Sequence, residues 1–145
     1  MREIKFKGQQ LSNGDWIVGD LNHLVDGVYI SNDNGNNMAQ VNPDTVCQFT
    51  GFLDKNGKEI YEGDILRSDE YPFSCMEDDA RDNYFGIIEW SNEEAMFVLT
   101  CVKNPKSSVR GISDGISEEI TQQKLDGFEI VGDIHNTEWK SKLNL

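Results

Sequence analysis

The feature that most constrains how this chain folds is a series of short apolar segments separated by turn residues. In residues 49–65, FTGFLDKNGKEIYEGDI, apolar residues flank the dipeptide Asn56-Gly57. Asn and Gly both tolerate the positive φ angles that a tight hairpin turn requires. We therefore predict a β-hairpin in which Asn56-Gly57 occupies the positive-φ positions of the turn.

The end of this segment carries Glu62, Gly63 and Asp64 before the apolar pair Ile65-Leu66. Gly63 can adopt a bulge or corner conformation that a Cβ atom would oppose. An Asp at such a corner accepts hydrogen bonds from nearby backbone N–H groups. We therefore predict that Asp64 caps the corner, and we interpret the whole segment as a folding element.

Similar short apolar or alternating segments predict further strands. In the first of them, Ile4 and Phe6 are expected to face the core and the charged residues between them to face solvent. The other strands are predicted at residues 16–21, 27–31, 86–90, 96–100 and 127–134, with turns at Asn13-Gly14, residues 32–38 and Pro43-Asp44.

One helix is predicted to begin at Ser117, a good N-cap residue. Glu118 and Glu119 favour the positive end of a helix dipole, and Gly127 is a suitable exit. Its apolar side would carry Ile116, Ile120 and Leu125. A last helical turn is expected near the C-terminus, held in place by Trp139.

These elements predict a mainly β fold. The 145 residues are 37% hydrophobic and 10% aromatic, which is enough for a core. We expect small antiparallel β lobes that include an SH3-like, partly open barrel, with one or two short helices near the C-terminus. The predicted parts are an N-terminal β lobe at 1–48, the barrel lobe at 49–136 with an acidic loop at 69–83 and a polar loop at 103–115, and a helical tail at 137–145. They are also compatible with one compact domain.

Net charge is the strongest compositional signal. Twenty-six acidic and 13 basic residues give a formal charge of −13. Such a surface repels phosphates, so nucleic acid is an unlikely ligand, whereas basic proteins, cations and solubility are all favoured. The densest acidic stretch is a candidate interaction loop with the carboxylates Asp69, Glu70, Glu77, Asp78, Asp79 and Asp82. It lacks EF-hand spacing, so we predict no metal site there.

A dipeptide, Gly-Asp, recurs in similar surroundings at Gly19-Asp20, Gly63-Asp64 and Gly132-Asp133. The unequal spacing argues against a solenoid. We interpret the three sites as one strand-corner arrangement used repeatedly. The alternative is that the three carboxylates converge on a cation.

Catalytic residues are not apparent. The two histidines, His23 and His135, lack a nucleophile or metal-binding motif around them. Glu62 and Asp64 are two residues apart and would form an acid pair if both faced the same way, but corner capping is the favoured interpretation. The three cysteines are expected as reduced thiols in or near the core: Cys47, Cys75 and Cys101, of which Cys75 is the best candidate for a reactive thiol. We predict no enzyme activity, no cofactor and no metal.

The sequence resembles the YopX family of small proteins typical of phages, prophages and mobile elements. The resemblance rests on the start MREIKFKG, the middle segment QFTGFLDKNGKEIYEGDIL, the segment GIIEWSNEEAMFVL and the close FEIVGDIHNT. Residues that match the family signature are Gln48, Phe49, Thr50, Gly51, Asp54, Gly57, Ile60, Tyr61, Glu62, Gly63, Asp64 and Ile65. The chain departs from the family at residues 7–16 and at Asn136-Thr137. The resemblance implies a mainly β fold and a phage or mobile-element origin, with a signature that is structural.

The function expected from these observations is that of a non-enzymatic accessory protein that acts by protein–protein contact or self-association. The alternative is an acidic mimic of nucleic acid that occupies a host DNA-binding protein. Direct nucleic-acid binding through the barrel is a third hypothesis and would rely on Lys103, Lys106 and Arg110. With no signal peptide and no apolar run long enough to span a membrane, a cytoplasmic location is expected.

Overall fold

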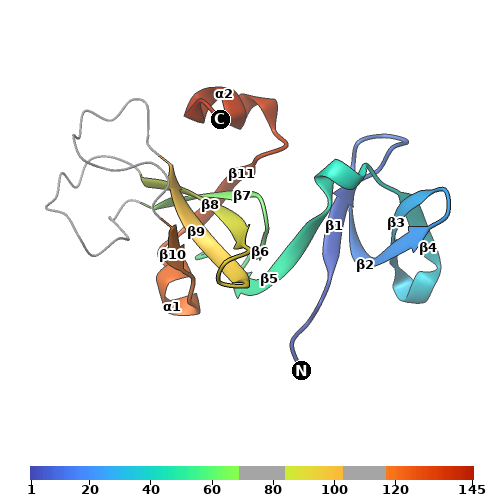
Figure 1. Ribbon diagram of the computed structural model, residues 1–145, viewed down its shortest axis with the longest axis horizontal. Helices are drawn as coiled ribbons and strands as arrows, with labels where there is room; N and C mark the ends of the chain where they lie inside the picture. The colour runs from blue at the N-terminus through green and yellow to red at the C-terminus, as the bar shows by residue number, and fades with distance from the viewer. Residues whose placement is uncertain (69–83, 103–116) are drawn as a thin grey trace, which may run out of the picture. The chain divides into compact units, whose positions relative to one another are not determined.

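The computed structural model describes residues 1–68, 84–102 and 117–145 (Figure 1). The chain divides into two compact units, Met1–Gly51 and Phe52–Leu145. The division falls three residues beyond the predicted boundary at residue 48. The predicted acidic loop and polar loop both lie outside the described residues.

Unit 1 is built from four antiparallel strands and the first part of a fifth. Two short 3-10 helices, η1 (Asp33–Gly35) and η2 (Pro43–Thr45), connect them at predicted turns. Ile17, Ile30 and Val41 form the core, against which Phe6 packs. The strands are β1 (Phe6–Gln9), β2 (Trp16–Leu24), β3 (Gly27–Asn32), β4 (Asn37–Gln40) and β5 (Cys47–Leu53), and the sheet order is β4-β3-β2-β1-β5-β6.

The first strand is shorter than the sequence predicts. It begins at Phe6, and Ile4 is 54% exposed, so the prediction that Ile4 faces the core is wrong. The first ladder pair that β1 makes with β2 joins Phe6 to Gly19. Met1 and Ile4 therefore gain little from apolar burial.

Unit 2 contains the second sheet, an antiparallel meander in the order β10-β9-β8-β7-β11. Its two edge strands are not paired to each other in the described residues, so the sheet is open. The mainly β prediction, with short helices near the C-terminus, is confirmed. The elements are β6 (Glu59–Tyr61), β7 (Asp64–Ser68), β8 (Tyr84–Ser91), β9 (Met96–Val102), β10 (Ser117–Glu119), β11 (Glu129–Asp133), α1 (Gln122–Leu125) and α2 (Thr137–Leu143).

The two faces of this sheet are covered by different clusters. One cluster joins Leu66, Ile88 and Leu99 to residues around α1, including Leu125 and Phe128. The other joins strand residues to the C-terminal helix and consists of Ile65, Phe85, Ile87 and Leu143, with Trp139 packed against them. The ring centroids of Phe85 and Trp139 lie 5.7 Å apart, so Trp139 holds α2 in place as predicted.

The predicted hairpin is present, but its turn differs in detail. Gly57 has φ of +78°, whereas Asn56 is not among the positive-φ residues, so only one of the two predicted positions is left-handed. The N–H of Gly57 donates to the carbonyl of Asp54 at 3.0 Å. Because the loop between the strands is five residues long, it needs only one left-handed residue, and glycine supplies it.

The helix predicted from Ser117 is wrong at its start. Ser117–Glu119 is a strand, β10, paired to Thr100, Leu99 and Val98 of β9. The N-cap of α1 is Thr121, four residues later, whose side chain accepts a hydrogen bond from the N–H of Lys124. Both Ser117 and Thr121 have N-cap chemistry, and pairing with β9 decides between them.

Nor do the three Gly-Asp dipeptides form one repeated corner. Gly63 has φ of +84° at a corner, Gly19 lies within β2, and Gly132 lies at a register shift in β11 where a Cβ would come 2.6 Å from the Trp139 indole nitrogen. The shared sequence therefore serves three different packing needs. Among the described residues, no three His, Cys, Asp or Glu side chains are placed to hold a metal ion, which contradicts convergence of the three carboxylates.

Both edges of the second sheet are covered by local contacts. At β11, the N–H of Lys55 donates to the carbonyl of Phe128 at 2.8 Å, and the N–H of Ile130 donates to the Asp54 carboxylate at 3.0 Å. At β10, the Lys124 ammonium donates to the carbonyl of Glu119 at 2.8 Å. Contacts of this kind occupy edge groups that would otherwise pair with a strand of another molecule.

Gln122 closes the end of β5 through its side-chain amide. Its Oε1 accepts the N–H of Leu53 at 3.1 Å, and its Nε2 donates to the carbonyl of Leu53 at 2.8 Å. We expect Gln122→Ala to lower the free energy of unfolding by about 1 kcal/mol, because two partly exposed hydrogen bonds are lost. Urea denaturation of this variant beside Gln123→Ala, which removes the exposed neighbouring amide, measures the effect. Equal midpoints for the two variants would contradict the role given to Gln122.

Candidate functional site

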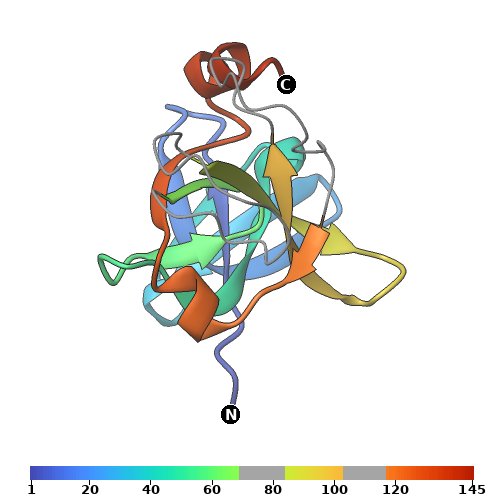
Figure 2. The same cartoon turned by 90° about the vertical axis from the view of Figure 1, so that its left-hand side faces the viewer.

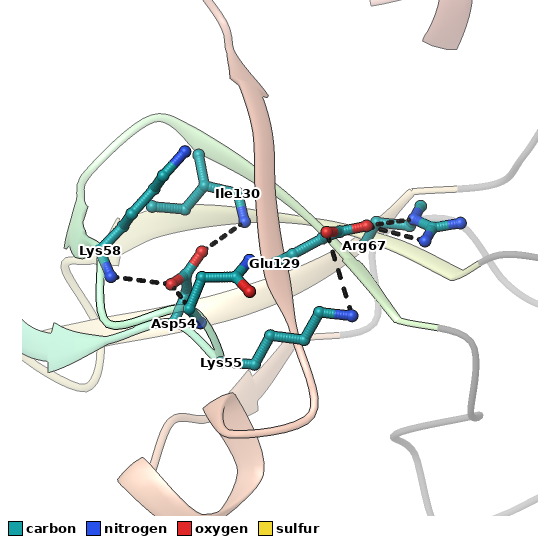
Figure 3. A network of polar contacts seen from close by, with 7 residues as sticks. Asp54, Lys55, Lys58, Arg67, Glu129 and Ile130 are labelled. Carbon is teal, nitrogen blue, oxygen red and sulfur yellow. Dashed lines mark hydrogen bonds and ion pairs between the residues drawn. The ribbon is translucent and has the colours of Figure 1, made fainter.

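One signature residue with several backbone partners is Asp54, whose carboxylate is buried (Figure 3). Its Oδ1 accepts the N–H groups of Asn56 and Lys58, both at 2.9 Å, which shapes the turn. Its Oδ2 accepts the N–H of Ile130 at 3.0 Å, which attaches the turn to β11. This carboxylate therefore joins two segments that are 76 residues apart in the chain.

An ion-pair network lies beside it, also shown in Figure 3. The Arg67 guanidinium contacts the Glu129 carboxylate at 2.7 Å, and the Lys55 ammonium lies 4.0 Å from the same carboxylate. Glu129 and Arg67 are cross-strand neighbours in the β11–β7 pair. All three side chains are about a quarter to a third exposed, so the network adds a modest amount to strand pairing.

The corner at Gly63 is closed by a second buried carboxylate. Asp64 is 2% exposed, and its Oδ2 accepts the N–H of Tyr61 at 2.8 Å, which is the capping contact predicted from the sequence. The N–H of Gly63 donates to the carbonyl of Ile88 at 2.7 Å, and the carbonyl of Gly63 accepts the N–H of Ile134. The geometry accounts for Asp64 as a corner cap, which is the interpretation favoured over an acid pair with Glu62.

The remaining signature residues lie in β5 and β6, in the turn between them, and at the start of β7. Phe49 and Thr50 are buried, Gln48 is half-buried opposite Phe6, and Gly51 has φ of +90°. The signature thus consists mainly of core and turn positions.

A different kind of surface occurs on the β8–β9 hairpin. Trp90 and Phe97 are directly opposite each other across the two strands, with ring centroids 5.1 Å apart in an edge-to-face arrangement. The next pair along the same face, Ile88 and Leu99, is fully buried, and Phe97 packs against their cluster. Trp90 lies where this core ends and is 45% exposed. Figure 2 shows the turn of this hairpin, in yellow, projecting past the neighbouring strands of its sheet.

The turn of the hairpin is acidic. Residues 84–102 contain Glu89, Glu93 and Glu94 but no Lys or Arg. Glu93 and Glu94 are exposed in the turn, and none of the ion pairs found among the described residues includes them. Glu89 accepts a hydrogen bond from Thr100 at 2.7 Å on the opposite face of the hairpin from Trp90. We call Trp90, Phe97, Glu93 and Glu94 the hairpin surface.

The family model described as YopX protein matches residues 2–138 of the chain, which is nearly its whole length. The chain belongs to the YopX family. The crystal structure of protein EF1440 from Enterococcus faecalis is similar at 19% sequence identity with a TM-score of 0.50, over 93% of this chain and 95% of that chain. This similarity concerns the fold alone. No curated protein sequence matches the chain.

Other candidate residues of this YopX-family chain are dispersed. Cys47 and Cys101 are buried thiols, as expected. His23 is exposed in the last part of β2, not in the loop that the sequence indicates, and His135 is half-buried after β11. Cys75, the six carboxylates of residues 69–82, and the bases Lys103, Lys106 and Arg110 lie outside the described residues. In the part of the chain that is described, no helix is long and apolar enough to cross a membrane.

The pKa values of Tyr29 and Glu138 are shifted, and neither residue belongs to the hairpin surface. The pKa of Tyr29 is raised by its hydrogen bond to the Asp26 carboxylate, with a smaller contribution from desolvation and charge. The pKa of Glu138 is lowered by the hydrogen bond and charge of Lys142, one helical turn away in α2. The pKa shifts therefore arise from a turn contact in unit 1 and from an ion pair within a helix in unit 2.

Sequence reasoning missed the hairpin surface. It identified both strands but gave no role to Trp90, Phe97 or the glutamates between them. The available signal was the absence of basic residues from residues 84–102 together with an aromatic residue on each side of an acidic turn.

Proposed function

We propose that this YopX-family protein is a non-enzymatic accessory protein of a phage or mobile element that acts through protein–protein contact at its hairpin surface. The observation that carries the proposal is the exposed Trp90, held edge-to-face by Phe97 on a β-hairpin anchored in the core. Trp is enriched among the residues that dominate binding energy at protein interfaces. A ring held before binding loses little conformational freedom when a partner covers it.

The buried carboxylates of the signature support binding over catalysis. The Asp54 carboxylate accepts the N–H groups of Asn56, Lys58 and Ile130, and the Asp64 carboxylate, 2% exposed, accepts the N–H of Tyr61. Groups engaged in this way hold turns in place and have little access to a substrate. The contacts of these two carboxylates favour a signature that specifies the fold. The function is then carried by a different surface.

Contact through side chains is better supported than strand addition at an edge of the second sheet. Both edges of the second sheet carry contacts from Asp54, Lys55 and Lys124. Self-association by edge-to-edge pairing would have to displace them. The acidic nucleic-acid mimic stays a prediction, because its densest group of carboxylates lies outside the described residues.

Trp90→Ala is expected to abolish retention of the partner from a lysate by the tagged protein. Removing a central interface Trp costs about 2 kcal/mol or more, a change in dissociation constant of roughly thirtyfold or more. The matched control is Leu24→Ala, which truncates a side chain of similar exposure, 49%, in unit 1. Quantitative mass spectrometry of the retained proteins compares both variants with the unmodified protein. Retention that survives Trp90→Ala, or is lost equally with Leu24→Ala, would remove the hairpin surface as the contact site.

A further inference from the structure

Resting on the proposed function, we propose that the hairpin surface binds an arginine-bearing segment of a partner protein, with a guanidinium group against the exposed indole of Trp90. The partner is therefore a basic protein segment, not a nucleic acid and not a second copy of the same hairpin.

The negative charge of the hairpin favours a positively charged partner. Glu93 and Glu94 lie exposed at the turn, and residues 84–102 contain no base to neutralise them. The protein as a whole carries a formal charge of −13, so its field attracts cations to this projection. The same charge opposes a phosphate backbone, and it opposes the identical hairpin of a second copy.

The aromatic pair determines the type of cation. Trp is the best aromatic acceptor for a cation over its face, and arginine is the cation found there more often than lysine. The guanidinium is planar and weakly hydrated, so it can stack on the indole and donate hydrogen bonds to a carboxylate at the same time. The rings of Phe97 and Trp90 make an edge-to-face contact, and Trp90 is still 45% exposed.

The hairpin is also a firm support for such a contact. Its two strands are paired from Phe85–Val102 to Ser91–Met96, and the N–H of Glu94 donates to the Ser91 hydroxyl at 3.3 Å within the turn. The carboxylates therefore project from a defined turn directly after the strand that carries Trp90.

The probe for the test is an acetylated hexapeptide of alternating glycine and arginine. The protein contains three tryptophans, so the indole N–H signals of Trp16, Trp90 and Trp139 in a ¹⁵N spectrum report binding at three separate places. We expect the Trp90 signal to shift saturably while the other two stay in place. The same peptide with citrulline for arginine, which keeps the shape and removes the charge, is expected to cause no shift at equal concentration.

Two variants test the groups separately. Glu93→Gln combined with Glu94→Gln should weaken peptide binding about fivefold, and Trp90→Leu should weaken it about two- to fivefold. Because Trp90→Leu removes the indole signal, binding to this variant is measured from the backbone amide signals of Glu93 and Glu94. The control is Asp15→Asn combined with Asp33→Asn, which removes the same amount of charge from exposed positions in unit 1. Equal weakening by the control, equal binding of the citrulline peptide, or an unmoved Trp90 signal would overturn the proposal.

These results are distinguishable from a failure of the proposed function. If Trp90→Ala abolishes partner retention but the arginine peptide does not bind, the contact site stands and the basic partner is wrong. If neither depends on Trp90, the hairpin surface is not a contact site and both proposals fall.

Discussion

Asp54→Ala should lower the free energy of unfolding of unit 2 by about 3–5 kcal/mol, because the variant leaves three backbone N–H groups without their acceptor. The donors belong to Asn56, Lys58 and Ile130, at 2.9, 2.9 and 3.0 Å. Asp54 is 3% exposed, so water cannot easily replace the lost carboxylate. Urea denaturation followed by circular dichroism measures the change.

Asp54→Asn separates the two contacts of this carboxylate. With its amide oxygen at the Oδ1 position, Asn keeps the acceptor for the two turn N–H groups. Its amide nitrogen then faces the N–H of Ile130, and this contact is lost because both groups are donors. We therefore expect Asn to restore part of the stability lost with Ala and to leave β11 less protected from hydrogen exchange. The control is Glu119→Ala, which removes an exposed carboxylate from the same unit and should change stability by less than about 0.5 kcal/mol. Similar stabilities for Asp54→Ala and Glu119→Ala would contradict the central place given to Asp54.

The sequence predicts the local contacts around Asp54, within the turn, but not its contact with the distant β11. Turn chemistry around Asn56-Gly57 is visible in five residues, and the corner at Gly63 follows from glycine and aspartate beside an apolar step. The bond from Asp54 to Ile130 spans 76 residues and depends on β11 lying beside the turn. No pattern within either segment carries that information.

The same limit explains the error at the start of α1. Ser117, Glu118 and Glu119 have the chemistry of a helix N-terminus, but they pair with β9 as a strand. The Lys124 ammonium then contacts the Glu118 carboxylate at 2.7 Å and the Glu119 carbonyl at 2.8 Å, which holds the strand against the helix that follows. Tertiary pairing overrides a local preference whose value is about 1 kcal/mol.

The hairpin surface could be predicted only in part. The sequence predicts its two strands but not the pairing of Trp90 with Phe97. An alternating strand pattern places Trp90 on a face, yet the register with Phe97 determines that the two rings meet where the core ends. A one-residue change of register would move Phe97 to the opposite face from Trp90. The surface therefore becomes visible only when the sheet is assembled.

Gly19→Ala is expected to destabilise unit 1 by about 2–4 kcal/mol, because a Cβ atom at this position would overlap the Ser31 carbonyl oxygen and lie 2.7 Å from the carbonyl carbon. The obstructing atoms belong to the backbone of β3, which is paired to β2 through Asp20 and Ser31. A side chain could rotate away, but this backbone can move only by lengthening the hydrogen bonds of the ladder. The strain of Gly19→Ala is therefore expected to spread along the β2–β3 hairpin.

Gly127→Ala is the matched control, since a Cβ there would meet only the Lys124 carbonyl oxygen at 3.6 Å, an ordinary contact. We expect this control to change stability by less than about 1 kcal/mol. Hydrogen exchange of the β2 and β3 amides, read together with the indole signal of Trp16, locates the damage of Gly19→Ala in unit 1. If the two variants unfold at the same urea concentration, the close approach of β3 to Gly19 does not constrain the sequence. If Gly19→Ala alone loses protection, the Gly-Asp dipeptide at this site is required by backbone packing, and its likeness to the corner at Gly63 is limited to sequence.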